Sequence, residues 1–300
     1  MEHVKQDGDS ALNPGAATGV ATTAGNIDRR DFLGAALGAS FALAVQPVAA
    51  QSVINTDSIG LTAGTVILHI NGQDVPVYRA QPEGKSDLPV VLVVSEIFGV
   101  HAHIADVARR FAKLGYLALA PDLFVRQGDP GSIASIPQLM KDIISQTPDQ
   151  QVMMDLDACV AWASQNGGNS GKLGITGFCW GGRITWLYAA HNPTLKAGVA
   201  WYGRLVAQAS KLQPANPVDI AASLTVPVLG LYGGKDDGIP PASIEQMQVA
   251  LAKGGSGSQF HVYPDAGHAF NADYRPSYVA ADAKDGFARC LAWFKNHGVA

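Results

Sequence analysis

The chain contains the stretch ITGFCWGG at residues 175–182, from which the predicted architecture follows. A short apolar segment ends at Gly-x-Cys-x-Gly and is followed at once by residues suited to a helix. This is the nucleophile-elbow pattern, with a thiol where most such enzymes carry a hydroxyl. The sharp reversal strains its central residue, and flanking glycines let the turn close because they lack a Cβ. The pattern predicts a nucleophilic Cys179; the alternative is an inert core cysteine.

Candidate partners for this thiol follow in the order nucleophile, acid, histidine that the elbow architecture uses. Asp236 lies in a glycine-containing turn after one apolar segment, and His268 lies in a loop after the next. We therefore expect a Cys179, Asp236, His268 triad, in which the histidine moves protons and the carboxylate fixes its tautomer. Asp237 is an alternative acid, and an ordinary loop position is the alternative for each residue.

A third element is the predicted strand at residues 89–94, which ends in an acid and a loop that contains glycine. In this architecture the loop and the residue after the nucleophile each give one oxyanion-hole N–H, so Ile97 and Trp180 are the expected donors. A carboxylate in this place is costly unless paired or protonated, so Glu96 is expected to tune the thiol. Arg126 could neutralise Glu96, bind an acidic substrate, or be an ordinary surface arginine.

Five motifs together resemble those of dienelactone hydrolases (carboxymethylenebutenolidases) of the α/β-hydrolase superfamily. They are SEIFG at 95–99, YLALAPDLF at 116–124, GFCWGG at 177–182, GGKD at 233–236 and AGHAF at 266–270, within a resemblance that covers residues 64–298. The resemblance implies the triad of Cys179, Asp236 and His268. It also implies that Glu96 holds the resting thiol in a poorly nucleophilic state until an anionic substrate displaces it, and that Arg126 helps to bind the substrate carboxylate.

The sequence departs from the family pattern at one position. The best-known members have a second carboxylate-binding arginine four residues after the histidine, where this chain has Ala272. Arg275 lies close by in the sequence and could reach the same space. The resemblance therefore predicts the type of reaction but leaves the substrate open.

The expected function is hydrolysis of a lactone or carboxylic ester, without a cofactor or metal. The Cys179 thiolate attacks the carbonyl, and water activated by His268 hydrolyses the resulting thioester. Two alternatives stay open: a non-catalytic small-molecule binding protein on the same fold, and a thiol oxidoreductase, which the lack of a nearby resolving cysteine disfavours. A formal net charge of −4 with scattered lysines and arginines argues against nucleic acid as a partner.

The rest of the chain predicts one α/β domain over residues 64–300, with a mostly parallel sheet and helices on both faces. Apolar residues recur at helical spacing over 104–114 and 152–163. Alternating segments on either side of Asn71-Gly72 predict an antiparallel hairpin, with strands at 65–70 and 75–79.

The other two cysteines and a pair of histidines are candidates for a disulfide and for a metal site. Cys159 and Cys290 fall among the apolar residues of predicted helices, so all three thiols are expected to be free. His101 and His103 form a His-x-His where a helix is predicted to start. A metal site is one reading, but no further ligand stands at a suitable spacing, and solvated helix-start histidines are the alternative.

Residues 1–50 predict a Tat-type export signal. Arg29-Arg30 precedes an apolar run that ends near Val45, and a small-residue end follows at Ala50. The run is too short to span a bilayer as a helix, although an anchor or an amphipathic helix is the alternative. We expect the Tat translocation machinery as a partner, cleavage after Ala50, a linker over 51–63, and a periplasmic or secreted protein without a stable membrane anchor.

Overall fold

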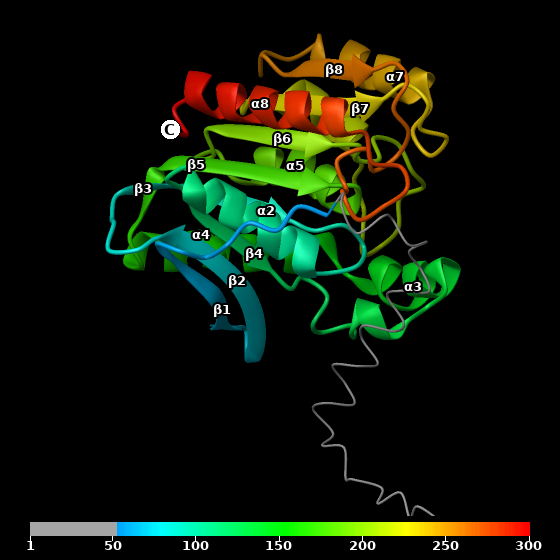
Figure 1. Ribbon diagram of the computed structural model, residues 1–300. Helices are drawn as coiled ribbons and strands as arrows, with labels where there is room; N and C mark the ends of the chain where they lie inside the picture. Colours follow the sequence, from blue (N-terminus) through cyan, green and yellow to red (C-terminus); the bar gives the residue numbers. More distant parts are fainter. Residues whose placement is uncertain (1–52) are drawn as a thin grey trace, which may run out of the picture.

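The computed structural model describes residues 53–300, so the expected export signal lies outside the described residues. Eight strands form one sheet in this part of the chain. They are β1 (Leu61–Ile70), β2 (Gln73–Pro82), β3 (Leu88–Val94), β4 (Leu117–Pro121), β5 (Gly168–Phe178), β6 (Ala197–Trp201), β7 (Val228–Gly233) and β8 (Gln259–Tyr263). Their order is β1-β2-β4-β3-β5-β6-β7-β8, as Figure 1 shows. Pairing is antiparallel from β1 to β2 and from β2 to β4, and parallel elsewhere. This confirms the predicted mostly parallel sheet.

The opening hairpin confirms the prediction but is longer than expected. Strands β1 and β2 pair from Ile70 opposite Gln73 back to Leu61 opposite Pro82. Asn71 and Gly72 both have positive φ, which is the backbone that a two-residue turn between twisted strands requires. The first residues of β1 belong to the stretch that the sequence assigned to a linker, so that boundary was wrong.

The chain before β1 is attached to the domain rather than loose. The backbone N–H of Ile54 donates to Asp273, and the Arg109 side chain donates to the carbonyl of Thr56 at 2.6 Å. Lys113 forms an ion pair with Asp57. Arg109 and Lys113 both belong to helix α2 (Ala102–Lys113), which covers the sheet. Residues 54–57 therefore run along this helix.

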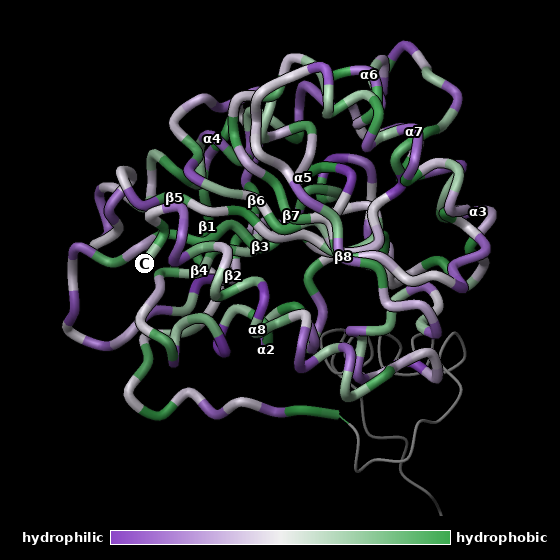
Figure 2. Tube along the Cα trace, turned by 90° about the horizontal axis from the view of Figure 1, so that it is seen from above, coloured by the Kyte–Doolittle hydropathy of each residue, from purple (hydrophilic) through white to green (hydrophobic). Residues whose placement is uncertain are grey.

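Helices cover both faces of the sheet, as predicted. Helices α2 (Ala102–Lys113) and α8 (Ala280–Asn296) lie on one face, and α4 (Asp149–Gln165), α5 (Trp180–His191) and α7 (Pro241–Leu251) lie on the other, as Figure 2 shows from above. The helices predicted over 104–114 and 152–163 correspond to α2 and α4. Two short helices, α3 (Ile136–Asp142) and α6 (Pro217–Ile220), were not predicted. No helix within residues 53–300 is both long and apolar enough to cross a membrane.

The core lies on both sides of the central strands. Residues 90–94 of β3 have no exposed surface, and a continuous apolar run is what a parallel strand covered on both faces requires. The one hydroxyl in the buried part of β5 is paired, since Thr176 accepts a hydrogen bond from the Trp201 indole and donates one to the carbonyl of Val199. Burying this polar group therefore leaves no hydrogen bond unmade.

The two cysteines assigned to packing are buried in α4 and α8. All three cysteines are free, as predicted. Burial raises the pKa of the Cys159 and Cys290 thiols far above the ordinary range, because a thiolate is poorly solvated in the core. Both are therefore unreactive, which leaves Cys179 as the accessible thiol within residues 53–300.

The turn from β5 to α5 closes only because glycine occupies its crowded positions. A Cβ on Gly177 would overlap the carbonyl of Gly181, and a Cβ on Gly181 would overlap the carbonyl of Val94 in β3. The contacting atoms are backbone on both sides, so no side chain can move away. The strand, the turn and the helix thus approach more closely than residues with side chains allow.

Gly181→Ala should lower the free energy of unfolding by about 1–3 kcal/mol, because the added methyl group displaces backbone in a packed region. Urea unfolding followed by circular dichroism measures this loss. Gly255→Ala is the matched control, since a Cβ there meets nothing within 4 Å. Equal stability of the two variants would contradict the argument from close approach.

Candidate active site

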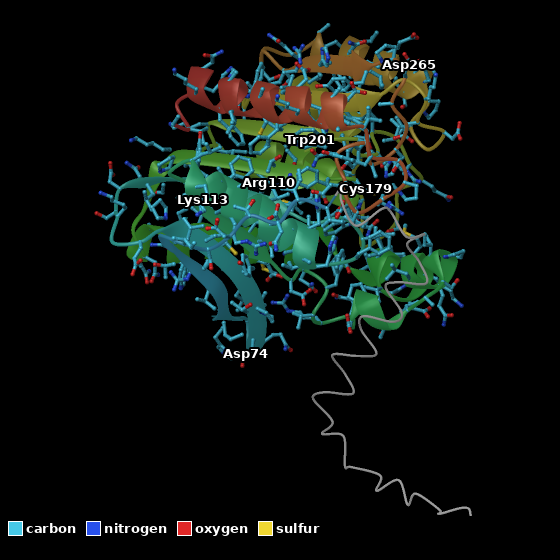
Figure 3. The ribbon with its side chains drawn as sticks, viewed as in Figure 1. Asp74, Arg110, Lys113, Cys179, Trp201 and Asp265 are labelled. Atoms are coloured by element: carbon cyan, nitrogen blue, oxygen red, sulfur yellow. The ribbon has the colours of Figure 1, made fainter. Side chains whose placement is uncertain are left out.

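Cys179 sits at the bend between β5 and α5, where the carboxyl ends of the parallel strands meet (Figure 3). Its backbone has φ 54° and ψ −113°, a conformation that a residue with a side chain rarely adopts. The bend is held because the Cys179 N–H donates to the carbonyl of Trp201 and its own carbonyl accepts from the N–H of Gly182, both at 3.0 Å. The thiol is partly exposed, and the N-terminus of α5 favours negative charge there.

The expected histidine and acid lie together. Nδ1 of His268 donates to Oδ2 of Asp236 at 2.7 Å, and Oδ1 of Asp236 accepts from the N–H of Gly238 at 2.9 Å. Asp236 is buried, whereas Asp237, the alternative acid, is exposed. The structure therefore gives His268 a single carboxylate partner, at the position that sequence order predicts.

The thiol and the imidazole form a second contact. Burial by itself lowers the pKa of His268, but hydrogen bonds to Asp236 and Cys179, together with their negative charges, raise it to about 10. The imidazole is therefore protonated at neutral pH, and the sulfur of Cys179 faces it. The structure thus brings Cys179, Asp236 and His268 together.

Backbone strain is concentrated around these side chains. Five non-glycine residues within 53–300 have positive φ, and three of them are Cys179, Tyr202 and Ala269. Tyr202 follows the end of β6 and packs its ring edge against His268 at 5.2 Å between ring centroids, while Ala269 directly follows His268. Strain of this kind persists only where surrounding packing holds it, and it commonly marks functional sites.

The expected oxyanion-hole residues lie beside the thiol. Ile97 and Trp180 both line the cavity that contains Cys179. Neither backbone N–H donates a hydrogen bond to another residue within 53–300. Two amide donors next to the Cys179 thiol are therefore available to a ligand oxygen.

Glu96 is fully buried in the loop after β3 and also lines the cavity. Its Oε2 accepts a hydrogen bond from Nε2 of His101 at 3.2 Å. Burial raises the pKa of Glu96, but the hydrogen bond and the charge of His101, with a contribution from His103, hold it below its ordinary value. Glu96 is therefore an anion at neutral pH.

The His-x-His pair points inward instead of into solvent. His103 is buried, and its Nδ1 donates to Oδ1 of Asp273 at 3.0 Å, while Arg110 donates to Oδ2 at 2.7 Å. Among residues 53–300, no three histidine, cysteine or acidic side chains stand together as a metal site would require. These two histidines connect the start of α2 to the loop after His268, through Asp273 and Tyr274.

The position of Arg126 corrects the sequence-based expectation. Its two terminal nitrogens bind both oxygens of the buried Asp155 in α4, at 2.6 and 2.9 Å, and it also donates to the carbonyl of Ile70. It does not line the cavity of Cys179, and it does not contact Glu96. Only tertiary structure brings Asp155 to this point, so the sequence could not show that the guanidinium was already occupied.

The cavity has a volume of about 700 Å³ and contains groups of three kinds. Cys179 and its expected partners lie among them. An apolar wall comes from α3 and the turn after it, with Ile136, Met140 and Ile144. Cationic groups come from Arg183, Arg204, Arg275 and Lys235, and Lys235 forms an ion pair with Asp265.

The three arginines differ in what they can bind. Arg183 is occupied by a two-point ion pair with Asp149. Arg275 lies over the ring of Phe98, 5.3 Å from its centroid, and neither it nor Arg204 forms an ion pair with another described residue. The sequence had suggested Arg275 only as a possible replacement for the arginine missing at Ala272. Arg204 follows the carboxyl end of β6, a position where residues of parallel sheets commonly face ligands.

Together, the eight-stranded sheet, the strained elbow and the residues at the strand ends define an α/β hydrolase. The model of the dienelactone hydrolase family matches residues 75–298. A candidate carboxymethylenebutenolidase from Methylorubrum extorquens is 58% identical over 275 residues, covering 91% of this chain and 94% of its own. A second, from Escherichia coli, is 54% identical over 259 residues and covers 86% and 95%.

A solved structure extends the comparison to three dimensions. The crystal structure of a candidate dienelactone hydrolase from Klebsiella pneumoniae has a TM-score of 0.77 and 54% identity, covering 78% of this chain and 98% of its own. The chain belongs to the dienelactone hydrolase family and is a hydrolase. The family resemblance predicted from five short motifs is thereby confirmed.

Replacing Arg126 should affect stability and not substrate binding. Arg126→Met leaves Asp155 buried without its partner and should lower the free energy of unfolding by about 3–5 kcal/mol. The double variant Arg126→Met/Asp155→Leu removes both charges and should recover most of this loss. Urea unfolding measures both effects. A tenfold rise in KM for carboxylate-bearing esters alone, without loss of stability, would contradict the assignment.

Proposed function

We propose that this protein hydrolyses lactones or carboxylic esters through a Cys179, His268, Asp236 triad and a thioester intermediate. The observation that supports the proposal most directly is the contact of a strained, accessible thiol with an imidazole that a buried carboxylate orients. This combination is the geometry of nucleophilic catalysis in acyl transfer. Membership of a hydrolase family supports the same type of reaction.

In the first step, the Cys179 sulfur forms a bond to the substrate carbonyl carbon, and the carbonyl oxygen becomes an oxyanion. The backbone N–H groups of Ile97 and Trp180 donate hydrogen bonds to this oxyanion. When the intermediate collapses, the carbon–oxygen ester bond breaks, and His268 gives its proton to the departing alkoxide. With a lactone, that alcohol stays attached to the acyl group.

In the second step, water attacks the thioester carbonyl and gives a proton to His268. Acylation removes the thiolate, so the contribution of Cys179 to the raised pKa of His268 disappears while that of Asp236 remains. The imidazole can then lose its proton closer to neutral pH and act as a base. Collapse of the second intermediate breaks the carbon–sulfur bond, releases the carboxylic acid and restores the thiolate.

The cavity suggests a substrate with an apolar part and a negative group. Ile136, Met140 and Ile144 form its apolar wall, and Arg275 and Arg204 offer positive charge. Because Arg126 is occupied by Asp155, we infer that these two arginines, and not Arg126, favour an anionic substrate. Both lie on loops after strands, where ligand contacts of such folds gather.

Cys179→Ala should reduce hydrolysis of p-nitrophenyl esters by several orders of magnitude, because it removes the nucleophile. Cys159→Ala is the matched control and should keep activity close to that of the unchanged protein, since that thiol is buried in α4. Mass spectrometry of the quenched protein should show the acyl group on Cys179. A loss below about tenfold in Cys179→Ala would remove the thiol from the reaction. Ligand binding without turnover by the unchanged protein would favour a binding protein.

We also infer that the protein is exported by the twin-arginine route, from the sequence of residues 1–50 alone. Lysines in place of Arg29 and Arg30 should keep the protein in the cytoplasm at full length. Lys5→Gln is the control, because it removes a positive charge outside the motif. Fractionation and N-terminal sequencing measure the outcome, and the exported form should begin at Gln51. Cytoplasmic protein with an intact N-terminus in the unchanged strain would refute export.

A further inference from the structure

We propose that His101 is a positioning residue that keeps the buried Glu96 carboxylate ionised and fixed beside the Cys179 thiol. The inference rests on the proposed function, since it concerns how reactive that thiol is. It assigns a role to a histidine that the triad does not use. The consequence is that His101 determines whether the nucleophile faces a negative or a neutral neighbour.

Glu96 needs a partner because of where it lies. A carboxylate without exposed surface is disfavoured as an anion unless a positive or hydrogen-bonding group compensates for the lost water. Among residues 53–300, the ion-pair partner of Glu96 is His101, at 3.2 Å between Oε2 and Nε2. Arg126, the other candidate, is occupied by Asp155. Tyr274 adds a hydrogen bond and His103 a weaker charge interaction, but the largest compensation for the Glu96 charge comes from His101.

The His101 ring is held in place on several sides. It packs against the edge of Tyr274 at 4.9 Å and stacks with His103 at 6.1 Å between ring centroids. His103 is itself fixed by its hydrogen bond to Asp273. His101 is the N-cap residue of α2, and its side chain makes no capping hydrogen bond there, so the ring is not needed to cap the helix. A ring fixed in this way can hold the carboxylate in one orientation.

The groups that face Glu96 come from four further parts of the fold. They are His101 and His103 at the start of α2, Tyr202 after β6, Tyr274 in the loop after His268, and Cys179 at the elbow. Both tyrosines feel the negative charges of Glu96 and Cys179, and Arg275 partly offsets them. Glu96 and Cys179 thus act on the same hydroxyl groups. A charged Glu96 opposes formation of the thiolate, whereas His268 favours it.

The test compares iodoacetamide alkylation of Cys179 between pH 5.5 and 8.5 in four proteins: unchanged, Glu96→Gln, His101→Leu and the double variant. Modification is followed on the peptide that contains Cys179, because the other two thiols are buried. With His101 present, Glu96→Gln should speed alkylation on the order of tenfold throughout this range, since it removes a negative charge from the thiol's surroundings. In the His101→Leu background, Glu96 should already be protonated at pH 5.5, so Glu96→Gln should not change the rate of alkylation there. Towards pH 8.5, Glu96 should ionise, and Glu96→Gln should again speed alkylation.

A structural role for His101 alone would not produce this pH-dependent difference. Equal effects of Glu96→Gln in both backgrounds at every pH would overturn the inference, and so would the absence of any effect. If His101→Leu does not fold, His101→Gln replaces it. Glutamine keeps a hydrogen-bond donor but removes the imidazole, so the effect of Glu96→Gln should shrink at pH 5.5, and an unchanged effect would again overturn the inference. His69→Leu is the matched control, as it removes an exposed histidine paired with Asp74 and should change nothing.

The two proposals can fail separately. Ester hydrolysis that survives Cys179→Ala would sink the triad proposal, whereas alkylation reports directly on the thiol and its neighbours without requiring turnover. Conversely, suppose that Cys179→Ala abolishes ester hydrolysis but Glu96→Gln has the same effect on alkylation with histidine and with leucine at 101. Only the role of His101 would then be refuted.

Discussion

The structure depends on one close approach, between the bend after β5 and the end of β3. Glycine at 177 and 181 lets backbone meet backbone there, which places the strained Cys179 at the N-terminus of α5 and opposite the loop after β3. Because that contact leaves no side chain to adjust, the thiol, the two amide donors and Glu96 hold fixed positions relative to one another. Preorganisation of this kind is what makes such donors effective towards a developing charge.

Buried charge imposes a second constraint around the site. Asp155, Asp273 and Glu96 are all buried acids, and each has a basic partner from a different element. Removing one partner strands a charge, so these pairs hold helices and loops in a particular arrangement. The Asp273 group is the most extended, since it joins α2, the loop after His268 and the backbone of Ile54. The segment before β1 is thereby connected to the wall of the active site.

Local sequence was sufficient for most of the fold and for the central side chains. The elbow glycines, the turn at Asn71-Gly72 and the helical spacing in α2 and α4 are short-range signals, and the structure shows each element where it was expected. Other features depend on contacts between distant residues. The sequence suggested that Arg126 would bind Glu96 or an acidic substrate. It instead binds Asp155 of α4, which has no exposed surface. Helix α3 lies in a stretch rich in loop-forming residues, so the sequence did not predict it. Only the structure shows that its apolar side chains line the cavity.

The sequence by itself determined the opening hairpin, the mostly parallel sheet, the bend at Cys179, and the positions of the acid and histidine that follow it, because these depend on residue type and spacing along the chain. Tertiary structure alone decided which charges meet. It paired Arg126 with Asp155 and Glu96 with His101, and it brought Arg275 to the ring of Phe98. The physical reason is that burial makes each of these charges depend on a partner, and the partner is set by how elements far apart in the chain pack together.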